Sequence, residues 1–97
     1  MKDVHIILSK EAKEVIEYLN KEASSSKTER MILNAFEHKK VLIKMNPHYG
    51  DPISKDKIPS EYKNKYGTTN LFRVELPSYW RMLYTLTEGN TKIEIVA

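Results

Sequence analysis

The C-terminal stretch from Asn70 to Ala97 constrains the fold more than any other part of the chain. Apolar and polar residues alternate on both sides of Pro77-Ser78-Tyr79 and again after Gly89-Asn90, which is typical of a three-stranded antiparallel meander. The side chains expected on its apolar face are Phe72, Val74, Leu76, Trp80, Met82, Tyr84 and Leu86. We expect this face to form the core side of a sheet.

The two turns also predict how the strands pair. The expected cross-strand partners are Leu76 with Trp80, Glu75 with Arg81, Leu86 with Ile93 and Tyr84 with Ile95. A slip by one residue would bury Lys92 and Glu94. The opposite face then carries Arg73, Glu75, Arg81, Leu83, Thr85 and Thr87. We expect any chemistry of the protein on that face.

A strand and two helices are predicted before the meander. Val4–Leu8 is a short apolar run that indicates a strand, and Ser9 is a favourable N-cap for a helix over residues 10–23. Residues 26–29 form a capping-box pattern that opens a second helix, which we expect to end near Met45. The two helices are therefore predicted to form a helical hairpin.

Residues 47–67 predict a long connection, because prolines are frequent there and large aliphatic side chains are few. We expect one short helical turn from Ser60 to Lys65 within it. Long connections inside small domains are usually functional or mobile.

The order of these elements predicts one α+β domain over residues 1–97, in which the N-terminal helical hairpin packs on a four-stranded, mostly antiparallel sheet. The first strand is apolar at consecutive positions, and two helices separate it from the meander. We therefore expect it to pair in parallel with Thr91 to Val96. If the Trp80 ring is buried, Trp80→Ala should cost about 3–5 kcal/mol.

The composition argues against several classes of protein. The chain has no cysteine, so it has neither a disulfide framework nor a thiolate nucleophile. His5, His38 and His48 lack the spacing of metal ligands, and we expect no metal and no cofactor. No apolar run has membrane-spanning length and the N-terminus lacks a secretory segment, so we expect a soluble cytoplasmic protein. A net charge of +3 at pH 7 permits an anionic partner.

Basic and aromatic side chains are interleaved in the long connection. The candidate RNA-binding residues there are Lys55, Lys57, Lys63, Lys65, Tyr62 and Tyr66. Lysines neutralise phosphates and tyrosine rings stack on unpaired bases, so this mixture suits RNA. Asp51, Asp56 and Glu61 interrupt the pattern. Taken alone, it fits a solvated loop of mixed charge better.

Arg73, Glu75 and Arg81 are candidates for catalysis, because the expected register brings them to one patch on rigid strands. Two guanidinium groups can hold a phosphodiester while the carboxylate takes a proton from its 2′-hydroxyl. The alternative is a cross-strand ion pair between Glu75 and Arg81 that only supports the sheet. On these residues alone, the ion pair is the simpler interpretation.

The order of elements and the sequence FRVELPSYWRMLYTL together resemble the RelE/ParE superfamily of bacterial and archaeal toxins. The motif most typical of that family is an aromatic-Arg-x-x-Tyr strand, here Trp80 to Tyr84, preceded by a strand such as Leu71 to Leu76. The layout covers essentially the whole chain, whereas the specific similarity is confined to this hairpin.

The resemblance implies roles for three side chains. Arg81 matches the arginine that stabilises the transition state in RelE-like toxins, and Arg73 matches a basic position on the preceding strand. Glu75 departs from the pattern, because a lysine can stand there in the family. Members also continue past the last strand into a segment with a catalytic Tyr, His or Arg. Since this sequence ends at Ala97, we expect weak cleavage or none.

The resemblance further implies a toxin of a toxin–antitoxin system. Such a protein binds messenger RNA on the ribosome, cleaves it without a metal ion, and is neutralised by an antitoxin that covers the basic face. The alternative is a non-catalytic binding module of the same fold. That module would be an inhibitor of DNA gyrase, as in the ParE branch, or a degenerate toxin that binds only its antitoxin.

Overall fold

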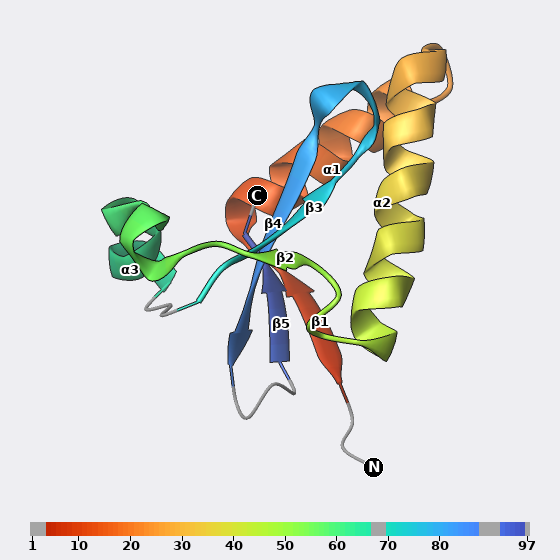
Figure 1. The fold of residues 1–97 in the computed structure, drawn as a ribbon. Helices are drawn as coiled ribbons and strands as arrows, with labels where there is room; N and C mark the ends of the chain where they lie inside the picture. The colour runs from red at the N-terminus through yellow and green to blue at the C-terminus, as the bar shows by residue number, and fades with distance from the viewer. Residues whose placement is uncertain (1–3, 67–69, 88–91, 97) are drawn as a thin grey trace.

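The computed structural model describes residues 4–66, 70–87 and 92–96. These residues form an α+β structure with three α-helices and a five-stranded sheet, shown in Figure 1. The strands are β1 (His5–Leu8), β2 (Asp51–Pro52), β3 (Phe72–Glu75), β4 (Arg81–Thr87) and β5 (Lys92–Ile95). The helices are α1 (Lys10–Glu22), α2 (Lys27–Met45) and α3 (Ser60–Tyr66). Within the described ranges, no helix combines the length and apolarity that a membrane span requires.

The sheet has the strand order β1-β5-β4-β3-β2. Strand β1 runs parallel to β5, as predicted, and the other neighbours are antiparallel. The register of the meander is confirmed: Glu75 pairs with Arg81, Leu86 with Ile93 and Tyr84 with Ile95, and the Leu76 N–H donates to the Trp80 carbonyl at 2.8 Å. The turn expected at Gly89-Asn90 lies outside the described residues.

The prediction of a four-stranded sheet is wrong, because β2 adds a fifth strand inside the predicted connection. Asp51 pairs with Arg73 and Pro52 with Phe72, and the Ile53 N–H donates to the Leu71 carbonyl at 2.8 Å. A proline is tolerated there because β2 is an edge strand, which needs no N–H on its outer side. So short a strand leaves no periodic pattern to detect.

Both predicted helix starts are confirmed by their caps. The Ser9 hydroxyl accepts a hydrogen bond from the Ala12 N–H at 3.1 Å and donates to the Val96 carbonyl at 3.1 Å. The Ser26 hydroxyl accepts from the Glu29 N–H at 3.5 Å and donates to the Glu29 carboxylate. Ser9 therefore links the start of α1 to the end of β5, in addition to capping the helix.

Helices α1 and α2 pack on one face of the sheet and bury the predicted apolar stripe (Figure 1). The buried residues of this core are Ala12, Phe36, Ile43, Phe72, Val74, Met82, Tyr84, Leu86, Ile93 and Ile95. Leu76 and Trp80 lie on the same side but are only half-buried at the end of the hairpin. The premise of a fully buried Trp80 ring is therefore wrong, and its removal should cost less than a core aromatic does.

The connection between α2 and β3 covers part of the opposite face. Ile58, Leu71 and Val96 form a second buried cluster there, with Tyr62 of α3 and Leu83 of β4 packed against it. The short helix expected from Ser60 to Lys65 is confirmed as α3. The connection thus contributes to the core instead of crossing the surface.

Candidate functional site

Arg73, Glu75 and Arg81 lie together on the sheet face away from α1 and α2, as their alternation predicts. The Glu75 carboxylate lies between the two guanidinium groups, with Oε1 at 3.4 Å from Arg73 Nε and Oε2 at 3.9 Å from Arg81 Nε. All three side chains are partly exposed. This arrangement contains both the predicted catalytic patch and the predicted cross-strand ion pair.

Arg73 has one nitrogen, Nε, that forms no hydrogen bond with any of the described residues. Its Nε atom is buried, and the approach of Glu75 brings charge near it without the geometry of a hydrogen bond. A buried donor without a partner costs about 1–3 kcal/mol, and native proteins rarely retain one. An oxygen atom of a ligand placed beside Arg73 would remove that cost.

The connection and the sheet enclose an open groove of about 380 Å³ beside this patch. We call it the polar groove and define it by four of its lining side chains, Lys57, Tyr62, Arg73 and Arg81. Its floor and walls also include the apolar residues Ile53, Leu71 and Leu83, and Glu61 is the one acidic side chain among the described lining residues. Cationic groups over an apolar floor suit a ligand that has both phosphates and flat bases.

The structure divides the predicted RNA-binding residues into two sets. Lys57 and Tyr62 line the polar groove. Lys55 and Lys63 are exposed on the same connection but lie outside the described lining of the groove. Lys65 forms an ion pair with Glu11 at the start of α1, and the Tyr66 side chain lies outside the described part of the structure. The basic cluster of the sequence is therefore split in space.

Arg73 also lines a second hollow of about 350 Å³. It is lined by Lys39, Tyr49 and Asp51, and by Arg73 and Glu75 from β3. The Lys39 ammonium group donates to the Tyr49 hydroxyl at 3.0 Å. Arg73 is thus accessible from two neighbouring hollows.

Tyr84, the last residue of the aromatic-Arg-x-x-Tyr motif, has a structural role in this fold. Its hydroxyl accepts from the Gly50 N–H and donates to the Pro47 carbonyl, both at 2.8 Å. Burial raises the pKa of the phenol above its usual value of 10.0, the Gly50 hydrogen bond opposes this, and the nearby Asp51 charge raises it further. The side chain is fully buried, so it fastens the connection to the core and does not reach the polar groove.

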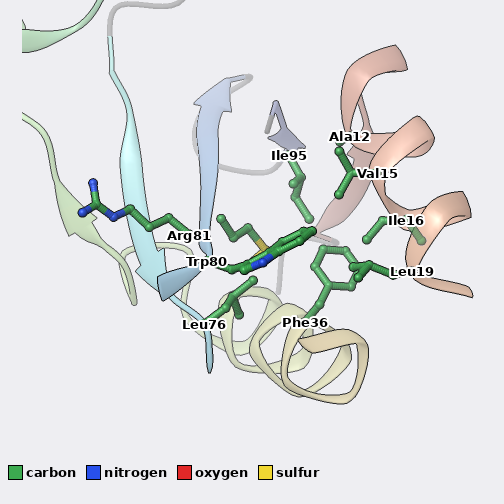
Figure 2. A pocket seen from close by; sticks show the side chains of 10 residues that line it. Ala12, Val15, Ile16, Leu19, Phe36, Leu76, Trp80, Arg81 and Ile95 are labelled. Carbon is green, nitrogen blue, oxygen red and sulfur yellow. The ribbon is translucent and has the colours of Figure 1, made fainter. Parts of the chain in front are cut away.

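An apolar pocket under Trp80 is a packing gap and not a ligand site. Figure 2 shows the Trp80 indole turned toward Phe36 and helix α1, while Arg81 extends to the opposite side. The pocket has a volume of only about 30 Å³, which is close to the space that one water molecule needs. It does, however, show that Trp80, just before β4, and Arg81, the first residue of β4, lie on opposite faces.

Comparisons with protein-family models, curated proteins and solved structures found no match. A functional assignment therefore depends on the chemistry of the polar groove. Among the described residues, no cluster of three or more His, Asp or Glu side chains could hold a metal ion. The groove offers guanidinium groups, an ammonium group, an aromatic ring and a carboxylate nearby.

Sequence reasoning missed two features of this region. The first is the partner of Tyr84, because nothing in the sequence indicates that its hydroxyl bonds to a loop 34 residues away. The second is Asn70, whose side-chain amide bonds the backbone of Leu86 through both its oxygen (2.8 Å) and its nitrogen (3.0 Å). The side-chain amide of Asn70 thus bonds β4 as the backbone of a neighbouring strand would. The presence of an asparagine in the sequence does not by itself predict this role.

Proposed function

We propose that the polar groove binds RNA, and that the protein is a RelE-like cytoplasmic toxin that cleaves messenger RNA without a metal ion. The observation that carries the proposal is the buried Arg73 Nε, which has no hydrogen bond among the described residues, in a groove with two further cationic side chains. Phosphate oxygens are the acceptors that suit such a site best. The resemblance of the β3–β4 hairpin to RelE-like toxins supports the same function.

The proposed chemistry uses the three side chains on the sheet. Glu75 takes the proton of a ribose 2′-hydroxyl, whose oxygen attacks the adjacent phosphorus as the bond to the 5′-oxygen breaks. The products are a 2′,3′-cyclic phosphate and a 5′-hydroxyl, which takes its proton from solvent. Arg73 and Arg81 stabilise the charge that develops on the phosphoryl oxygens.

Lys57 and Tyr62 bind the RNA in this scheme without taking part in bond breaking. Lys57 neutralises a phosphate equally in the ground state and the transition state, so it contributes affinity and salt dependence. An unpaired base can stack on the exposed part of the Tyr62 ring, the rest of which packs against Leu83 and its neighbours. An antitoxin that covers this cationic surface would block both the binding and the chemistry.

The test is cleavage of messenger RNA by purified protein in the presence of ribosomes. Arg81→Ala should lower the cleavage rate by about a hundredfold while RNA binding stays nearly unchanged. Arg30→Ala is a matched control, because Arg30 is exposed on α2, far from the groove in sequence. Lys57→Ala should instead weaken binding and reduce its salt slope by about one unit.

A non-catalytic binding module is the second candidate, and the position of Glu75 favours it. The carboxylate lies within 4 Å of both arginines, as expected of an ion-pair network that supports the sheet. In that case Glu75→Gln changes the free energy of unfolding by at most about 1 kcal/mol. No RNA cleavage is then expected from either the parent protein or the variant. Growth arrest of expressing cells with intact messenger RNA would establish this candidate and exclude the ribonuclease.

A further inference from the structure

Strand β1 leaves one edge of the sheet open. It is the outermost strand and pairs only with β5 in the described part of the sheet. The Ser9 N–H donates to the Ile95 carbonyl at 2.9 Å, so the backbone of Ile7 also faces β5. Since backbone direction alternates along a strand, the N–H and C=O groups of Ile6 and Leu8 point outward. These groups could pair with another strand.

A groove of about 520 Å³ lies beside this edge, between β1 and helix α2. We call it the edge groove. Its β1 side consists of residues 4–7, and its α2 side consists of Lys40, Val41 and Lys44. Val41 is 56% exposed and Met45, four residues further along α2, is 78% exposed. Val41 lines the edge groove together with apolar residues of β1, and apolar surface rimmed by polar residues is typical of interaction sites.

The charge of the edge groove defines what can occupy it. Lys40 and Lys44 are four residues apart, so their ammonium groups project from the same side of α2. Lys40 already contacts Glu37 at 3.1 Å, which shows that a carboxylate can be accommodated there. A second copy of this chain would bring its own lysines against these two, and the repulsion disfavours that occupant.

We propose that the edge groove binds an extended acidic segment of another protein, which adds a strand to β1. Its backbone would pair with Ile6 and Leu8, as in other cases of strand addition. Alternate apolar side chains would cover Val41, and its carboxylates would meet Lys40 and Lys44. This site is independent of the proposed RNA-binding function, because β1 and β3 are separated by two strands.

The probe for this proposal is a labelled peptide of about eight residues in which glutamate and valine alternate, a common strand length. Binding is measured by fluorescence anisotropy, and the contact site by amide hydrogen exchange. Exchange should slow at the Ile6 and Leu8 amides and stay unchanged at Arg73. The same peptide with a central proline should bind at least about fivefold more weakly, because one backbone donor is lost.

Charge reversal supplies the matched variants. Lys44→Glu should weaken peptide binding by at least about fivefold, whereas Lys13→Glu on the exposed side of α1 should leave it unchanged. Both variants carry the same net charge and change exposed residues, so both should fold. Equal weakening by the two variants would overturn the proposal.

Two other occupants give different results in the same assay. Protection of Ile6 and Leu8 by a single-stranded RNA oligonucleotide, with none from the peptide, would overturn the proposal in favour of a nucleic-acid site. Protection that rises with protein concentration alone would assign the edge to self-association and also overturn it. Loss of RNA cleavage in the Arg81→Ala variant bears on neither outcome.

Discussion

The two faces of the sheet are covered by different kinds of structure. Helices α1 and α2 lie over one face and bury a continuous core from Ala12 to Ile95, whereas the opposite face has a small cluster under an irregular connection. Beside the first face, the described residues leave the small gap at Trp80 and the edge groove at β1. On the second face, the connection covers only part of β3 and β4. The polar groove lies where it leaves these strands uncovered. Partial coverage is what gives this fold room for a ligand.

The contrast assigns different roles to adjacent residues on the same strand. Met82 and Tyr84 are fully buried under the helices, while the alternate residues Arg81 and Leu83 face the connection. Stability should therefore depend mainly on one alternate set of residues and binding on the other.

The largest expected effect separates Met82 from its neighbour Leu83. Met82 is 1% exposed in the main core, so Met82→Ala should lower the free energy of unfolding by about 2–5 kcal/mol. Leu83→Ala removes a partly buried side chain from the smaller cluster and should cost about 1–2 kcal/mol. Urea denaturation with an unchanged m-value measures both. Equal losses would mean that the two faces contribute alike.

Gly50 tests whether the connection is fastened to the main core. A Cβ atom there would lie 2.9 Å from Tyr84 Cε1, 3.0 Å from the Tyr84 hydroxyl oxygen and 3.1 Å from the Arg73 carbonyl oxygen. Because that carbonyl belongs to β3 and cannot move alone, Gly50→Ala should cost about 1–3 kcal/mol. Ser54→Ala, at an exposed position of the same connection, should change stability by less than about 0.5 kcal/mol. A neutral Gly50→Ala result would show that the loop moves freely over Tyr84.

The hairpin tip belongs to neither covered face and should tolerate change. Ser78 and Tyr79 have φ values of 58° and 65°, in the left-handed region that favours glycine or asparagine. The Tyr79 side chain is 99% exposed, so no burial of its ring offsets the cost of the left-handed backbone conformation. Tyr79→Gly should stabilise the protein by about 0.5–1 kcal/mol. Tyr79→Ala keeps the strained Cβ and should be nearly neutral in a thermal melt; a gain as large as that of glycine would assign the effect to the ring.

The smallest effect concerns the pH dependence of stability. The raised pKa of the buried Tyr84 phenol means that the unfolded chain loses this proton at a lower pH than the folded protein does. Stability from this group is complete below pH 10 and falls as the pH rises toward the folded-state pKa. Tyr84→Phe should lower stability at neutral pH and flatten the decline above pH 10. An unchanged slope in urea melts from pH 9 to pH 11 would rule out Tyr84 as the source.

The sequence was sufficient to predict the meander and the placement of the arginines. Alternation of apolar and polar residues defines the face of every residue in β3 and β4, so Arg73, Glu75 and Arg81 could be placed together before the structure was known. Alternation cannot predict β2, because a strand of two residues is too short to show an alternating pattern. It also cannot show that Lys57 joins the arginines while Lys65 pairs with Glu11, because the path of an irregular connection depends on tertiary contacts.

The parallel pairing of β1 was predicted correctly, but for a reason that holds only in part. Consecutive apolar residues are typical of a strand buried on both faces. In the structure Ile6 and Leu8 are half-buried and Ile7 is 40% exposed, because β1 lies at the edge and the connection does not extend over it. A run of consecutive apolar residues therefore occurs here in a strand that is only partly buried, at the edge of the sheet.

The bond from the Ser9 hydroxyl to the Val96 carbonyl joins residues 87 positions apart, and this has a consequence for the order of folding during synthesis. Strand β1 has no partner until β5 has left the ribosome. At a translation rate of about 5–20 residues per second, that delay is roughly 4–17 s. Until β5 is available, the helical hairpin cannot pack on the complete sheet, and part of its apolar stripe is expected to stay exposed. We therefore expect the nascent chain to depend on chaperones until β5 is available.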